Sequence, residues 1–98
     1  MAIIGGGVIG IEFAQIMQRM GVSVSVMEMM PQILPTEDAD MALMFESILR
    51  KDGIEIFTGV TVKKIETANK SKKLTFTTKE GANLKVVEKV LVAVGRSP

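Results

Sequence analysis

The 98 residues carry 12 lysines and arginines against 11 aspartates and glutamates, a net charge of +1 that gives no reason to expect a nucleic-acid partner. Cysteine, histidine, tyrosine and tryptophan are absent, which excludes thiol redox chemistry, Cys/His metal sites and imidazole acid–base catalysis within this chain. With 47% hydrophobic and 23% charged residues, and no apolar run near the roughly 20 residues of a membrane span, the composition predicts one small globular binding domain, cytoplasmic and without a membrane partner.

The chain begins with an apolar strand, Met1–Ile4, that leads into a glycine-rich turn. Gly5, Gly7 and Gly10 match the pattern G-x-G-x-x-G. Gly5 permits a tight turn, Gly7 lets a pyrophosphate approach the bare backbone, and Gly10 lets the following helix lie close to the strand. Because a helix N-terminus presents unpaired N–H groups and about half a positive charge, the turn is a candidate dinucleotide anchor. The pattern alone is weak, since glycine-rich turns also serve simple packing.

The residues after the turn predict a helix that begins at Val8 and ends at Gly21. Its apolar residues recur at helical spacing and are Ile9, Phe13, Ile16, Met17 and Met20. An alternating strand over 22–27 follows and ends in Glu28. Glu28 stands 18 positions after Gly10 (28 − 10), near the place where a Rossmann unit has the acid that accepts hydrogen bonds from the adenosine ribose. This order of strand, turn, helix, strand and acid strengthens the dinucleotide interpretation.

A loop with two prolines separates this strand from a second predicted helix, which Thr36 or Asp38 caps and Gly53 ends. The helix carries one apolar stripe that should cover a face of the sheet; the stripe is Met41, Met44, Phe45, Ile48 and Leu49. The eight methionines fall mostly on such stripes, so we expect most of them to fill the core.

Residues 54–57 are the third predicted strand, and right-handed crossovers make its sheet parallel. Three alternating runs then predict an antiparallel meander; they are 60–65, 74–78 and 84–86. The run 89–94 is almost wholly apolar, typical of a strand buried on both faces, and 95–98 should return to the sheet edge that carries the glycine turn. The predicted fold class is therefore α/β, a Rossmann-type parallel sheet with two helices and an inserted antiparallel β-meander.

Four segments resemble the NAD-binding domain of the flavin-dependent pyridine nucleotide–disulfide oxidoreductases, most closely the dihydrolipoamide dehydrogenase branch. They are 5–12, 24–28, 34–40 and 90–98, and the last is the most specific. The resemblance covers essentially all of 1–98. It implies that the domain binds NAD and positions the nicotinamide for hydride exchange with FAD, which the parent enzyme binds mainly outside this chain.

The resemblance also implies roles for matching positions and assigns no catalytic residue. The cofactor-binding residues it predicts are Gly5, Gly6, Gly7, Val8, Ile9, Gly10, Glu12, Glu28, Val62 and Gly95. Backbone groups of 7–10 would hold the pyrophosphate and Glu28 the ribose. Val62 would lie by the adenine, and Glu12 and Gly95 near the nicotinamide. On a purely structural interpretation, Glu12 is a solvated first-turn carboxylate and Gly95 a strand terminator.

The family's flavin domain, redox cysteine pair and histidine-bearing dimerisation domain are absent from this sequence. The chain is therefore expected to be a fragment that binds NAD(H) but reduces no disulfide by itself. Its partners would be the FAD and dimerisation domains of a homodimeric parent, and alone it is expected to be monomeric. Three alternatives stay open: the same domain of a mercuric, glutathione or NADH peroxide reductase, a FAD-binding Rossmann domain, and a scaffold that binds no nucleotide.

Overall fold

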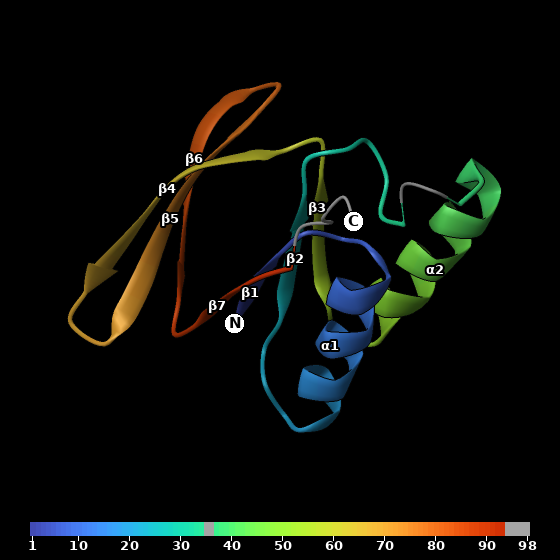
Figure 1. Cartoon of the computed structure of the whole chain (residues 1–98), viewed down its shortest axis with the longest axis horizontal. Helices are drawn as coiled ribbons and strands as arrows, with labels where there is room; N and C mark the ends of the chain where they lie inside the picture. Colours follow the sequence, from blue (N-terminus) through green and yellow to red (C-terminus); the bar gives the residue numbers. More distant parts are fainter. Residues whose placement is uncertain (35–36, 94–98) are drawn as a thin grey trace, which may run out of the picture.

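The computed structural model describes residues 1–34 and 37–93 and has a four-stranded parallel sheet at its centre (Figure 1). The strands are β1 (Ala2–Ile4), β2 (Ser25–Glu28), β3 (Glu55–Thr58) and β7 (Val90–Val92), in the spatial order β3-β2-β1-β7. Two helices connect the first three strands, α1 (Val8–Arg19) and α2 (Ala39–Lys51). A separate antiparallel sheet has the order β4-β5-β6, with β4 (Thr61–Ala68), β5 (Ser71–Thr78) and β6 (Gly81–Val87). The predicted fold class is confirmed.

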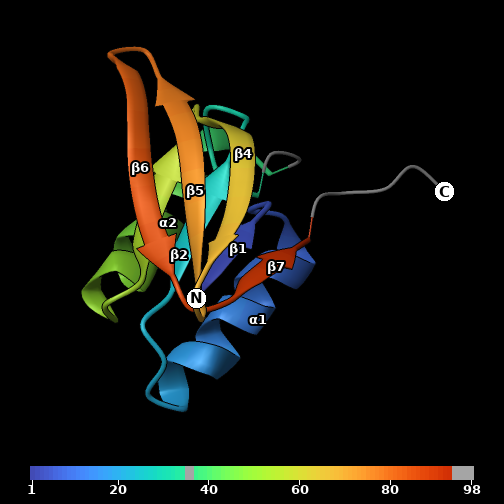
Figure 2. The same ribbon diagram turned by 90° about the vertical axis from the view of Figure 1, so that its left-hand side faces the viewer.

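The parallel sheet forms the middle of three layers, with both helices on one face and the antiparallel sheet on the other (Figures 1 and 2). Successive side chains of a strand point to opposite faces, and β1 follows this rule. Ile3 belongs to the core beneath the helices, whereas Ala2 and Ile4 belong to the core between the two sheets. Ile3 pairs in register with Val26, and Val26 with Ile56, so one apolar row crosses the sheet beneath the helices.

The start and the end of α2 agree with the predicted signals. The backbone N–H of Met41 donates to Asp38 Oδ1 over 2.9 Å, so Asp38 is the N-cap. The alternative cap, Thr36, lies outside the described residues. Gly53 follows the helix with φ +93°, a conformation that glycine adopts without a steric cost.

The buried face of α1 differs from the apolar stripe that its sequence suggests. Ile9, Ile16 and Met20 are exposed by 76%, 53% and 71%, whereas the residues buried in this helix are Gly10, Ile11 and Ala14. The buried face thus combines one large residue, Ile11, with two small ones, and the close approach of the helix to the turn requires the glycine at position 10. The stripe therefore points partly to solvent, and among its members Phe13 and Met17 pack against the core.

The prediction that α2 buries its apolar stripe was also wrong for most of the stripe. Leu49 is fully buried, but Met41, Met44, Phe45 and Ile48 are between 37% and 54% exposed. The same holds for the methionines: five of the eight are exposed, namely Met20, Met29, Met30, Met41 and Met44. The expectation that most methionines fill the core was therefore wrong.

Strand β7 is an edge strand, not one buried on both faces as its apolar sequence suggested. It pairs with β1, with Ile4 opposite Val92, and Val92 is 59% exposed. The meander strands are longer than predicted because their hairpins are tight. Asn69 has φ +57° and Gly81 φ +127°, so residues on both sides of each turn join the ladder.

Candidate dinucleotide site at the glycine turn

The glycine turn connects β1 to α1 at the carboxyl edge of the parallel sheet, where open α/β sheets bind their ligands. Gly5 has φ +116°, a conformation that L side chains rarely adopt, so glycine is required for the turn. The N–H of Gly5 donates to the carbonyl of Met27 over 2.8 Å, which ties the turn to the adjacent strand β2.

Gly7 and Gly10 have opposite surroundings. A Cβ atom on Gly10 would come within 3.0 Å of the Gly5 carbonyl oxygen, so the close approach of α1 to the turn requires glycine there. A Cβ atom on Gly7 would meet no described atom within 4 Å, and Gly7 has an ordinary φ of −78°. Neither the backbone nor the protein packing requires a glycine at position 7, which leaves open space in front of it.

The N-terminus of α1 begins behind this open space. Gly7 is the N-cap, and no side chain in the described part of the chain bonds the first-turn N–H groups as a cap. The first N–H groups of a helix have no intrahelical acceptor, and they carry the positive end of the macrodipole. Val8 and Ile9 are 57% and 76% exposed, so this helix end is accessible. The geometry suits a phosphate group.

Glu28 ends β2 beside the turn and is only 8% exposed. Its Oε1 accepts a 2.6 Å hydrogen bond from the N–H of Gly6, and its Oε2 accepts a 2.8 Å bond from the N–H of Met30. Sequence reasoning had placed Glu28 at a ribose and had missed both backbone contacts. These two hydrogen bonds satisfy the buried carboxylate within the protein.

Gly6 is the residue whose role the glycine pattern leaves undefined. A Cβ atom there would lie 3.2 Å from Glu28 Cβ and 3.2 Å from Ile33 Cγ2, which is tighter than nearly all real contacts. The unbroken run of three glycines was the available signal: a glycine at a variable position of the motif indicates that something packs against it. In this chain the packing partners are Glu28 and Ile33.

The other predicted site residues are Glu12, Val62 and Gly95, which come from three different parts of the chain. Glu12 is exposed on α1 but lies beyond the first turn, so its description as a first-turn carboxylate is wrong. Val62 lies in β4 and packs partly into the core between the sheets, two residues after Val60, whose N–H donates to the Glu28 carbonyl over 3.2 Å. Gly95 lies outside the described residues. The neighbouring Ala93 donates its N–H to the carbonyl of Ile4 over 2.8 Å, so the chain reaches the strand end that precedes the turn.

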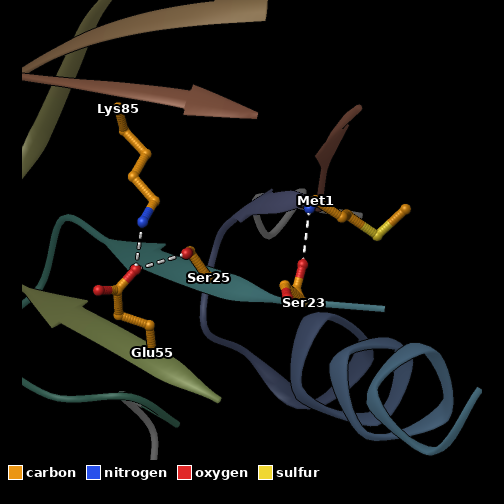
Figure 3. A network of polar contacts seen from close by, with 5 residues as sticks. All are labelled: Met1, Ser23, Ser25, Glu55 and Lys85. Carbon is orange, nitrogen blue, oxygen red and sulfur yellow. Dashed lines mark hydrogen bonds and ion pairs between the residues drawn. The ribbon is translucent and has the colours of Figure 1, made fainter. Parts of the chain in front are cut away.

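A hollow of about 680 Å³ lies at the opposite, amino edge of the sheet. Ser25, Glu55 and Lys85 line it, and Figure 3 shows them joined by hydrogen bonds to one carboxylate oxygen. Because its polar groups already bond one another and it has no helix N-terminus, the hollow is a poorer candidate for a phosphate than the glycine turn.

Residues 1–34 and 37–93 contain no group of three or more acidic side chains that could hold a metal ion. Over the same residues, neither helix is long and apolar enough to cross a membrane. The glycine turn with Glu28 is thus the place in the described structure where backbone geometry, accessibility and charge suit one ligand class.

Comparison with known proteins agrees with this fold. A family model described as pyridine nucleotide-disulphide oxidoreductase matches residues 1–83. The dihydrolipoyl dehydrogenase of Bacillus subtilis is 41% identical over 96 residues, which cover 96% of this chain and 20% of that protein. The chain spans about a fifth of the length of the curated relatives it matches.

Two solved structures extend the comparison. The Cu(II) complex of the HOCl-induced flavoprotein disulfide reductase RclA from Escherichia coli has a TM-score of 0.84 at 32% identity, covering 99% of this chain and 21% of that one. The water-forming NADH oxidase from Lactobacillus brevis, bound to NADH, has a TM-score of 0.83 at 26% identity, covering 96% and 20%. With a family model over most of the chain and a relative well above 30% identity along nearly all of it, the chain belongs to the pyridine nucleotide-disulphide oxidoreductase family.

Proposed function

We propose that the chain is the NAD(H)-binding domain of a dihydrolipoamide dehydrogenase-like flavoenzyme and positions the nicotinamide for hydride exchange with FAD. The observation that carries the proposal is the open backbone at Gly7 in front of the uncapped N-terminus of α1. The N–H groups of 8–10 would donate to the pyrophosphate, and the helix macrodipole favours its negative charge. The relatives named dihydrolipoyl dehydrogenase, and the NADH-bound oxidase of the same fold, support this choice of ligand.

The remaining predicted residues complete the proposed site. A carboxylate offers about four lone-pair sites, so Glu28 has capacity to accept from ribose hydroxyls beyond its two backbone donors. Val62 would lie by the adenine, because Val60, the residue before β4, donates its N–H to the Glu28 carbonyl. Glu12, which lies beyond the first turn of α1, and Gly95 would lie towards the nicotinamide.

We further propose that residues 1–98 are one domain of a longer enzyme. The chain spans about a fifth of its curated relatives, which leaves room for FAD and dimerisation domains. The exposed apolar residues outside the proposed site support the same proposal, since Ile16 on α1 and Leu43 on α2 are 53% and 61% exposed. Such residues would be covered by other parts of a homodimeric parent.

The test is isothermal titration calorimetry of NAD with the unmodified chain and with Gly7→Val. The Cβ atom of a residue at position 7 meets no described protein atom within 4 Å, and the valine side chain would occupy the space proposed for the pyrophosphate, so we expect NAD affinity to fall at least about 10-fold. The control Ala82→Val makes a similar change on an exposed position of β6 and should bind like the unmodified chain. Circular dichroism should show that both variants remain folded.

Three other results would contradict the proposed NAD site. Normal NAD binding by Gly7→Val would mean that the pyrophosphate anchor lies at another place. Tighter binding of FAD than of NAD by the unmodified chain would favour a FAD-binding Rossmann domain. No saturable signal with NADH, FAD or ATP would favour a scaffold domain.

A further inference from the structure

We infer that Glu28 is a positioning residue: its carboxylate holds the glycine turn in the conformation that receives the ligand's pyrophosphate. This role is separate from any contact with a ribose, and it rests on the proposed function. The two carboxylate oxygens each accept a backbone N–H, one from Gly6 in the turn and one from Met30 in the loop after β2. The side chain therefore joins two segments that are 24 positions apart (30 − 6).

The backbone around Glu28 adds further links between the same segments. The carbonyl of Gly6 accepts from the N–H of Leu34 over 2.7 Å, and the carbonyl of Met30 accepts from Gly59 over 2.9 Å. The Glu28 carbonyl itself accepts from Val60 over 3.2 Å. The turn, the loop after β2 and the start of β4 thus meet at this residue, and its carboxylate is the side chain at their centre.

The contacts specify a carboxylate rather than any side chain of that shape. Both partners are N–H donors, and an ionised carboxylate is acceptor-only, so each oxygen has a donor to face. Hydrogen bonds to an ionised acceptor are about twice as strong as those between neutral groups. Glutamine has the same shape but one acceptor oxygen, so its NH₂ group would face one of the two N–H groups. The absence of a side chain on Gly6 is what lets the carboxylate approach.

A role of Glu28 at the turn can be distinguished from a role at the ribose. If the carboxylate orients the turn, its loss weakens the binding of every ligand that places a phosphate at Gly7, whether or not the ligand has ribose hydroxyls. If the carboxylate acts only on the ribose, its loss matters only when those hydroxyls are present. A pair of ligands that differ only in the hydroxyls distinguishes the two cases.

The experiment measures binding of ADP and of 2′,3′-dideoxy-ADP to the unmodified chain and to Glu28→Gln by calorimetry. We expect Glu28→Gln to lower the affinity for dideoxy-ADP by about 10-fold or more, which corresponds to the loss of one charge-assisted hydrogen bond. Glu80→Gln, the same change in the exposed hairpin between β5 and β6, should bind both ligands like the unmodified chain. Equal binding of dideoxy-ADP by Glu28→Gln and the unmodified chain would overturn the inference.

Amide hydrogen exchange of the unmodified, ligand-free chain tests the same contacts without relying on the folding of a variant. The N–H groups of Gly6 and Met30 should exchange at least about 10-fold more slowly than that of Val8 in the uncapped helix end. Unprotected N–H groups at Gly6 and Met30 would overturn the inference. If the unmodified chain bound neither ADP nor NAD, the proposed function would fail, and the exchange result would still decide whether Glu28 holds the turn.

Discussion

At the glycine turn, an added methyl group should destabilise the fold at Gly10 and have little effect at Gly7. Gly10→Ala would place a Cβ within 3.0 Å of a backbone oxygen that cannot move without disturbing the Gly5 turn. We expect the free energy of unfolding to fall by about 1–3 kcal/mol, as for other overpacked sites. Gly7→Ala places its methyl group in open space at an ordinary φ and should change that free energy by less than about 1 kcal/mol. Urea denaturation followed by circular dichroism measures both, and equal midpoints would contradict the close approach of α1 to the turn.

Selection between NAD and NADP is expected to depend on a single residue, Glu28. The 2′-phosphate of NADP would bring an anion beside the Glu28 carboxylate, and residues 29–33 contain no cation to offset it. We expect NAD to bind about 10- to 1,000-fold more tightly than NADP. Glu28→Ala should weaken NAD and narrow that difference.

Met29→Arg tests the selection between NAD and NADP more directly, because it leaves Glu28 and its backbone contacts in place. Met29 is 66% exposed, so an arginine fits there and can meet the 2′-phosphate. In Met29→Arg, NADP affinity should rise and the preference for NAD over NADP should become smaller. The uncharged control Met29→Leu should leave this preference unchanged. Equal NAD and NADP affinities of the unmodified chain at low salt, where repulsion is least screened, would remove Glu28 as the selector.

At the scale of elements, periodicity finds the helices but not the faces that they bury. Both helices form where apolar spacing and terminal signals predict them. In α1, however, the small residues Gly10 and Ala14 face the sheet while Ile9 and Ile16 are exposed. The apolar pattern favours the larger side chains, but this helix buries Ile11 together with the small residues, and the close approach at Gly10 leaves no space for a side chain there. The sequence therefore determines the helix, and the packing distance determines its rotation.

An ion pair joins two elements that lie on different sheets. Lys85 on β6 donates to Glu55 on β3 over 2.6 Å, and Ser25 on β2 donates to the same carboxylate oxygen over 2.8 Å (Figure 3). The hydrogen bond from Lys85 lowers the pKa of the Glu55 carboxyl below its ordinary value, because it outweighs the opposing effect of partial burial. Part of the contact between the two sheets is therefore sensitive to acid.

The sign of this effect follows from the lowered pKa. A carboxyl with a lower pKa in the folded state stabilises the fold fully above its unfolded pKa of about 4.3, and this stabilisation is lost as pH falls through the folded value. The thermal midpoint should therefore fall less between pH 6 and pH 3 in Glu55→Gln than in the unmodified chain. Lys85→Gln removes the main cause of the shift and should behave similarly. The same acid dependence in all three proteins would exclude this ion pair as a contributor.

At the scale of the whole molecule, the proposed nucleotide-binding domain is expected to pass no electrons to a disulfide by itself. It contains no cysteine and no histidine. We predict that this chain alone, supplied with NADH, reduces lipoamide no faster than a control without protein, while calorimetry still detects NAD binding. The measurement is the loss of NADH absorbance. Turnover above the control would overturn the interpretation of the chain as one domain of a larger enzyme.

The sequence by itself determined the order of elements, the glycine turn, the acid at the end of the second strand and the cap of the second helix, because each depends on local chemistry. Gly5 and Asp38 act through their own backbone and their nearest neighbours. Only the tertiary structure decided that Glu28 bonds the N–H of Gly6, that apolar residues of both helices face outward, and that β7 is an edge strand. These properties depend on which segments, distant in sequence, come within contact distance, and a pattern of residue types along the chain carries no such distance.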